Sequence, residues 1–104
     1  MSGDPTIWRV RWTLAAAGDL EKISAYIGRD NPLAASRLAE EIVKRSEELA
    51  QHPYLGGISP MYPRARFFVS GQYLTYYTVE SREIVIRAVV HGARQFRPSW
   101  MKRR

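Results

Sequence analysis

Apolar and polar residues alternate near the start of the chain. In the segment IWRVRW, residues 7–12, three large apolar side chains alternate with two arginines. The apolar residues are Trp8, Val10 and Trp12. Because successive side chains of a strand point to opposite faces, this repeat of two predicts a strand that is buried on one face.

The next two segments repeat their apolar residues every three or four positions, which is typical of amphipathic helices. The first covers residues 13–30, where Thr13 can cap the helix. The second covers residues 31–52, with Asn31 as its cap and Pro32 in its first turn. The predicted buried stripes are Ala16, Leu20, Ile23 and Ile27, then Ala35, Leu38, Ile42 and Leu49. Because few residues separate the two helices, we expect them to form a hairpin.

Three strands are predicted in the second half of the chain: RARFFVS (64–70), QYLTYYTV (72–79) and EIVIRAVVH (83–91). The middle segment is apolar or aromatic on both sides, as expected for a strand at the centre of a sheet. The chain therefore predicts an α+β fold with an N-terminal strand, a helical hairpin and a three-stranded antiparallel meander.

The alternation within these strands indicates which side chains the helices leave uncovered. In the last strand the face of Ile84 is apolar, whereas Arg87 and His91 lie on the opposite face. If the helices cover the Ile84 face, the uncovered face of the sheet is basic. It would carry Arg64, Arg66, Arg87 and His91, with Arg94 and Arg97 just past its edge.

The charge of the chain is unevenly distributed. Its formal net charge is +6, but residues 1–52 hold 7 Lys/Arg and 8 Asp/Glu, whereas residues 53–104 hold 9 and 2. The halves therefore carry −1 and +7. A basic half suits an anionic partner, either nucleic acid or an acidic protein segment, although a generic basic protein would show the same count.

Composition and length limit the remaining possibilities. At 104 residues the chain fits one domain, 1–104, with a core over about 7–97 and a basic tail over 98–104. It has no cysteine, so disulfides and thiolate metal sites are excluded. The sequence shows neither a secretory signal nor an apolar run long enough for a membrane helix. We therefore expect a cytoplasmic protein that does not associate with membranes, and the residues suggest no metal and no cofactor.

Four segments together resemble the ParE/RelE toxin superfamily of bacterial type II toxin–antitoxin modules. In order they are DLEKISAYIGRDNPLAASRLAEEI, HPYLGG, YLTYYTV and VVHGARQF. The resemblance extends from about Trp8 to Arg97, and the order of predicted elements is similar to the fold of this superfamily. It implies a toxin that a cognate antitoxin neutralises. ParE-like members poison DNA gyrase, whereas RelE-like members cleave messenger RNA on the ribosome.

The HGAR corner and the proline-terminated second helix look more like the ParE branch. That branch implies a toxin that binds gyrase and breaks no bond itself, and hence no catalytic residue. The expected contacts with the target are Arg64, Arg66, Arg87, Arg94, Arg97 and Trp100. We also expect an antitoxin segment, disordered when free, to fold onto the grooves and edge of this chain. An inactive relative of these toxins is a third possibility.

The alternative, a ribosome-dependent endonuclease, needs a proton acceptor, a proton donor and cations around the phosphate. RelE-like enzymes use lysines and a C-terminal tyrosine, but this chain has no lysine between Lys44 and Lys102, and Trp100 stands near the place of that tyrosine. His91 is the candidate for proton transfer. A ribonuclease site would use Arg64, Arg66, His91 and Arg94, with Tyr62 or Tyr77 as a further proton carrier.

The corner His91-Gly92 has a structural interpretation as well. His91 can hydrogen-bond the local backbone and shape the turn, and Gly92 is predicted to adopt a conformation closed to residues with a Cβ. The corner would then present Arg94, either to an anion or only to solvent.

Overall fold

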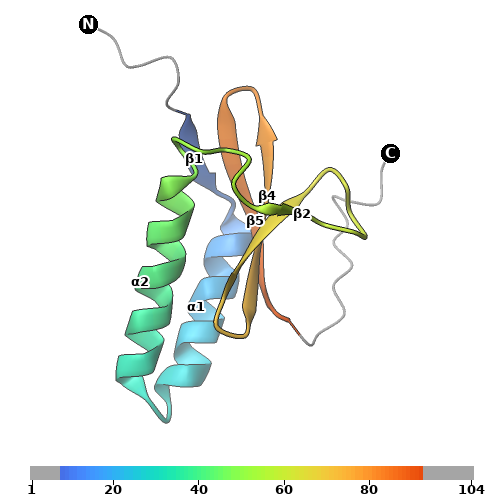
Figure 1. The fold of residues 1–104 in the computed structure, drawn as a ribbon. Helices are drawn as coiled ribbons and strands as arrows, with labels where there is room; N and C mark the ends of the chain where they lie inside the picture. The colour runs from blue at the N-terminus through green and yellow to red at the C-terminus, as the bar shows by residue number, and fades with distance from the viewer. Residues whose placement is uncertain (1–7, 93–104) are drawn as a thin grey trace, which may run out of the picture.

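The computed structural model describes residues 8–92 (Figure 1). Its elements are β1 (Arg9–Trp12), α1 (Leu14–Gly28), α2 (Pro32–Glu48), β2 (Gly57–Ile58), β3 (Arg66–Ser70), β4 (Tyr73–Glu80) and β5 (Glu83–His91). Each predicted element is present, and the α+β class is confirmed. The two-residue strand β2 is an addition to the predicted order. The basic tail, 98–104, lies outside the described residues.

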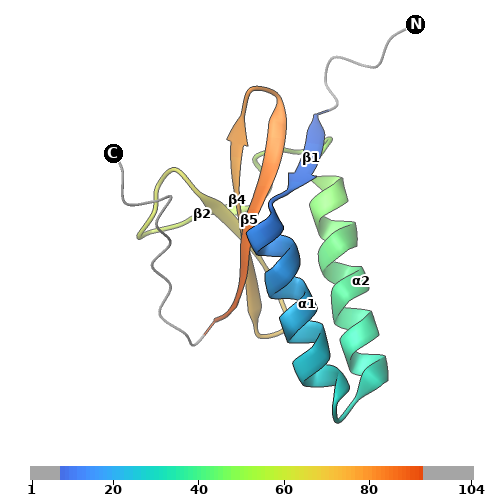
Figure 2. The ribbon, with the colours of Figure 1, turned by 180° about the vertical axis from the view of Figure 1, so that it is seen from behind.

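The strands form one sheet in the order β1-β5-β4-β3-β2. β1 is parallel to β5, whereas the other neighbours are antiparallel. The first strand therefore lies beside the last, and β4 is at the centre of the sheet, as its apolar sequence predicted. Figures 1 and 2 show α1 and α2 packed side by side on one face of the sheet.

Two caps fix the helical hairpin. The Thr13 hydroxyl accepts a hydrogen bond from the Ala16 amide and donates one to the Ile86 carbonyl, both at 3.0 Å. This side chain therefore starts α1 and also ties it to β5. Asn31 accepts a hydrogen bond from the Ala34 amide at 3.0 Å, and its cap confirms the predicted start of α2.

The core lies between the hairpin and the sheet. Its central cluster consists of Ala16, Leu49, Tyr77, Ile84 and Ile86. The predicted inner face of the first strand packs against this cluster. The face of Ile84 is therefore the one that the helices cover, as expected. No helix within residues 8–92 is both long enough and apolar enough to cross a membrane.

A register shift at Arg87 changes which face His91 occupies. Tyr76 pairs with Ala88 and Tyr77 pairs with Ile86, so Arg87 is an extra residue on β5. A bulge of this kind reverses the alternation beyond it. His91 pairs with Tyr73, which lies on the same face of β4 as Tyr77. The prediction that His91 lies on the uncovered face is therefore wrong, because simple alternation does not hold across the bulge.

Arg66 also lies on the helix-covered face. It pairs with Tyr77, and Phe68 of the same strand packs against the core cluster. Arg87 contacts Thr78, which points to the other face, so its predicted placement is confirmed. The predicted basic face is thus divided between both sides of the sheet.

Candidate functional site

The basic residues predicted to form one site lie in separate places. Arg64 is exposed in the turn before β3, Arg66 starts β3 and Arg87 lies in the middle of β5. His91 ends β5. Three other predicted contacts lie outside the described residues: Arg94, Arg97 and Trp100.

Arg87 is held in a polar network on the uncovered face. Its Nε donates to the Thr78 hydroxyl at 3.1 Å, and its Nη2 contacts the Glu80 carboxylate at 2.8 Å. The Thr78 hydroxyl also donates to Glu80 at 2.7 Å. These hydrogen bonds, from Thr78 first and then Arg87, lower the pKa of Glu80 from its ordinary value. The Arg87 charge is therefore largely balanced within the molecule.

Arg66 anchors the loop that follows α2. Its Nη1 donates to the carbonyls of Tyr54 at 3.2 Å and Gly56 at 2.8 Å. The Arg66 guanidinium also lies over the Tyr54 ring, with its Cζ 5.0 Å from the ring centroid. The side chain is thus fixed in position on the covered face of the sheet, at the end of β3 far from the Ser70-Gly71 turn.

His91 is oriented by its neighbours at the end of β5. Its Nε2 lies 3.0 Å from Gln72 Oε1, and its ring meets Tyr73 edge to face at a centroid distance of 5.3 Å. The Gly92 amide donates to the Gln72 carbonyl at 2.7 Å. Gly92 is not in the left-handed region, contrary to the prediction. Its glycine is favoured instead because a Cβ would lie 3.3 Å from that carbonyl oxygen.

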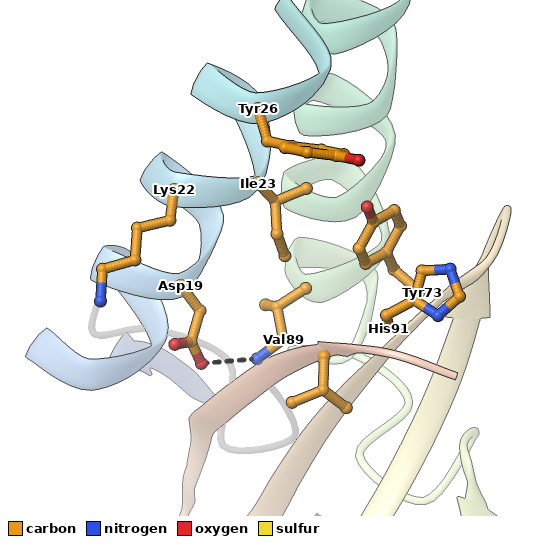
Figure 3. Close-up of a pocket in the computed structure, with 8 residues that line it drawn as sticks. Asp19, Lys22, Ile23, Tyr26, Tyr73, Val89 and His91 are labelled. Atoms are coloured by element: carbon orange, nitrogen blue, oxygen red, sulfur yellow. Dashed lines mark hydrogen bonds between the residues drawn. The ribbon is translucent and has the colours of Figure 1, made fainter. Parts of the chain in front are cut away.

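A cavity of about 710 Å³ separates α1 from the end of β5. It is lined by Asp19, Lys22, Ile23, Tyr26, Tyr73, Val89, Val90 and His91. Figure 3 shows Asp19 and Lys22 at one end and His91 at the other, with Ile23 and Val89 between them. An apolar middle separates the two polar ends, so no proton path between Asp19 and His91 is evident.

The Asp19 carboxylate takes the place of a missing strand neighbour. It accepts a hydrogen bond from the Val89 amide at 3.0 Å. β1 pairs with β5 only from Glu83 to Ile86, so within the described part of the chain the later half of β5 has no strand on that edge. The cavity therefore opens onto an unpaired strand edge.

The cavity residues on α1 are not among the site residues that the sequence predicted. Helical spacing places Asp19, Lys22 and Tyr26 on one stripe of α1. Their position opposite His91 depends on the bulge and on the packing of α1 against β5, which no local pattern reveals. Among residues 8–92, no group of three His, Asp or Glu side chains could hold a metal ion.

Comparisons with known proteins cover nearly the whole chain. Residues 10–96 match the family described as the ParE toxin of the type II toxin–antitoxin system parDE. Toxin RelE2 of Caulobacter vibrioides is 33% identical over 86 residues, which are 83% of this chain and 97% of that toxin. A putative toxin of Sinorhizobium fredii is also 33% identical over 89 residues, 85% of this chain and 92% of its own.

Solved structures agree in fold. A chain of the chromosomal ParDE system from P. aeruginosa has a TM-score of 0.73 at 23% identity, covering 83% of this chain and 97% of its own. A chain of the RelBE2 toxin–antitoxin complex from Mycobacterium tuberculosis has a TM-score of 0.61 at 22% identity, covering 82% and 98%. The predicted resemblance is therefore confirmed at the level of family and fold.

Proposed function

The chain belongs to the ParE toxin family of type II toxin–antitoxin systems, and we propose that it acts by binding DNA gyrase and poisoning it. In this mechanism the toxin breaks no covalent bond itself and requires no cofactor. It acts in the cytoplasm, where it inhibits growth unless an antitoxin holds it.

The observation that supports binding over catalysis is the spread of the cations relative to His91. Arg66 and His91 pair with residues of β4 that are four positions apart, which is about 13 Å along a strand. Arg87 lies on the opposite face and is bound to Glu80. Cleavage of RNA needs cations around the same phosphate that the base serves, and these residues do not meet that requirement.

The target contacts that we propose are five arginines and one tryptophan of the second half of the chain. They are Arg64, Arg66, Arg87, Arg94, Arg97 and Trp100. Arg64 is the best of the described residues to test, because it is exposed and lies in a turn. Arg37, an exposed arginine on α2, provides a matched control with the same change of charge.

The test is a gyrase supercoiling assay with the purified full chain, scored for inhibition and for protein-linked cleaved DNA. We expect both effects, and we expect Arg64→Glu to weaken them by about tenfold while Arg37→Glu does not. If folded protein that still binds its antitoxin has no effect on gyrase, the proposal is wrong.

The antitoxin is proposed to occupy the cavity and the unpaired edge of β5. A disordered segment could add a strand beyond Ile86 and place an apolar side chain between Ile23 and Val89. An acidic tract in the same segment would suit the basic second half of the chain. Calorimetric titration with the product of the neighbouring gene tests this, and a lack of association would contradict it.

A ribosome-dependent endonuclease is the second candidate, because His91 and Tyr73 are in contact. The phenol could donate a proton while the imidazole accepts one. Under this mechanism His91→Gln would abolish toxicity and messenger RNA cleavage but leave the fold and antitoxin binding intact. Under the gyrase mechanism the same substitution has a mild effect on growth.

A further inference from the structure

Two aromatic rings in contact lie between two arginines at one end of the molecule. The Arg82 Cζ lies 5.9 Å from the centroid of the Trp8 ring. Trp8 meets Tyr54 edge to face, with ring centroids 6.4 Å apart. Arg66 then lies over Tyr54 at 5.0 Å. We call these four side chains the arginine–aromatic row.

The row is assembled from four distant segments of the chain. Arg82 is in the β4–β5 turn, Trp8 precedes β1, Tyr54 is in the loop after α2, and Arg66 begins β3. Backbone hydrogen bonds hold these segments together. The Trp8 amide donates to the Ala50 carbonyl at 2.8 Å, and the Arg9 amide donates to the Arg82 carbonyl at 3.1 Å.

The four side chains of the row differ in how much of their surface is exposed to a ligand. Trp8 packs partly against the core, so it supports the row more than it displays a face. Tyr54 is 59% exposed, and Arg82 is exposed at the tip of its hairpin. Arg66 is fixed by two loop carbonyls, which hold its charge beside the Tyr54 ring. The exposed surface thus includes the Tyr54 ring with Arg66 beside it, and Arg82 on the far side of Trp8.

The hairpin tip presents Arg82 at a conformational cost. Ser81 and Arg82 have φ values of 48° and 63°, in the left-handed region that glycine and asparagine favour. A bulky residue at such a position costs about 1 kcal/mol or more. Its guanidinium lies over Trp8 at the surface, where the charge stays accessible to a ligand. The strained position is therefore a reason to assign Arg82 a contact role.

We propose that the arginine–aromatic row binds a single-stranded nucleic acid. Bases stack on exposed aromatic rings irrespective of sequence, and arginines on either side neutralise the phosphates that connect the bases. A duplex fits less well because its bases are already stacked on each other. The proposal goes beyond the gyrase mechanism and does not depend on it, because it concerns a direct contact between the toxin and nucleic acid.

The experiment measures fluorescence anisotropy of labelled oligonucleotides of about 15 residues with the purified full chain. The probes are a single-stranded DNA, a single-stranded RNA of the same sequence, and the corresponding DNA duplex. We expect the chain to bind at least one single strand more tightly than the duplex. Comparison of the single-stranded DNA and RNA probes then shows whether the ligand is unpaired DNA or messenger RNA.

Two variants test the row without unfolding the chain. Tyr54→Ala removes the exposed ring, and Arg82→Gly removes a charge while relieving the strained φ. Each is expected to weaken single-strand binding by about tenfold. Arg82→Gly should also leave the melting temperature at least as high as in the wild type.

A second pair of side chains provides a matched control. Arg29 lies over the Tyr26 ring at 5.6 Å near the end of α1, and Tyr26 is 67% exposed. The variants Tyr26→Ala and Arg29→Gly make the same chemical changes there, and the assay contains no antitoxin. They should leave single-strand binding unchanged. If these controls weaken binding as much as the row variants, or if the row variants have no effect, or if the duplex binds as tightly as the tighter-binding single strand, the proposal is overturned.

Discussion

Two threonines of β4 differ in what their hydroxyl groups contact. Thr75 is fully buried on the covered face, and its hydroxyl has no hydrogen-bond partner in the structure. Thr78 is buried on the other face, where its hydroxyl bonds to both Glu80 and Arg87. A buried polar group costs free energy when it lacks a partner, so these hydroxyls should contribute to stability with opposite sign.

We expect Thr75→Val to raise the free energy of unfolding by about 1 kcal/mol, since valine keeps the shape and removes the unsatisfied hydroxyl. Thr78→Val should lower it by about as much or more, because it deprives Arg87 and Glu80 of a partner. Urea unfolding of the two variants measures both changes. A loss of stability in Thr75→Val would indicate that its hydroxyl does have a partner in solution.

The Tyr77 hydroxyl links the loop after α2 to the core. It accepts a hydrogen bond from the Gly56 amide at 2.9 Å and donates one to the Pro53 carbonyl at 3.0 Å. A Cβ on Gly56 would lie 2.7 Å from this hydroxyl oxygen, so only glycine allows the contact. Burial raises the pKa of Tyr77 above its ordinary value of 10.0, although Gly56 and Arg66 oppose that change.

Because the pKa of Tyr77 is raised, the free energy of unfolding should fall at alkaline pH. The folded state disfavours the phenolate of Tyr77. The contribution of this phenol to the free energy of unfolding is therefore fully present below its pKa in the unfolded state, and it is lost as pH rises through its pKa in the folded state. We expect Tyr77→Phe to be less stable than the wild type by about 1 to 3 kcal/mol near neutral pH. Between about pH 9 and about pH 11, the free energy of unfolding of Tyr77→Phe should fall by less than that of the wild type. Urea unfolding at each pH measures both. Equal alkaline losses in both proteins would contradict this role for Tyr77.

At the scale of elements, the β4–β5 hairpin turns through residues poorly suited to it. Ser81 and Arg82 both have positive φ, as in the type I′ turns that favour Asn-Gly. The double variant Ser81→Asn, Arg82→Gly should therefore raise the free energy of unfolding by about 1 kcal/mol. Thermal unfolding measures this gain. The β3–β4 turn already has a glycine, Gly71, at a φ of 59°, so no comparable gain is available there.

The elements and their caps were predictable because local patterns determine them. Thr13 and Asn31 cap the helices that their spacing predicted, and the apolar residues of β1 face the core. Strand faces were less predictable. The bulge at Arg87 and the inward face of Arg66 depend on pairing between strands, which a single strand does not encode.

The candidate site was predictable only in part for the same reason. The sequence correctly indicated that the HGAR corner ends a strand, and it placed His91 there. The cavity beside His91 is also lined by Asp19 and Tyr26, which belong to a helix about 70 residues earlier in the chain. Their proximity follows from the parallel pairing of β1 with β5, which brings α1 back over the last strand.

At the scale of the whole molecule, none of the proposed target contacts that the structure describes, Arg64, Arg66 and Arg87, lines the cavity. Tyr26 lines the cavity and is 67% exposed, whereas Tyr54 is 59% exposed in the loop after α2. We expect Tyr26→Glu to weaken antitoxin binding by about tenfold or more and to leave gyrase inhibition intact. Cells that produce this variant should stop growing even when they also produce the antitoxin.

The matched variant Tyr54→Glu should keep its affinity for the antitoxin in the same calorimetric titration. Growth of cells that carry the Tyr26→Glu variant together with the antitoxin would show that the cavity is not part of the antitoxin site.

The parallel pairing of the first strand with the last also has a consequence for synthesis. Thr13 and Ile86, which bond to each other at the start of α1, are 73 residues apart. At about 5 to 20 residues per second, the chain needs about 4 to 15 s to extend from one to the other. During that time β1 has no neighbour, and the apolar face of the hairpin has no sheet to cover it. A nascent chain therefore cannot complete its sheet until β5 has emerged, so a translation product that ends before β5 should be harmless to the cell.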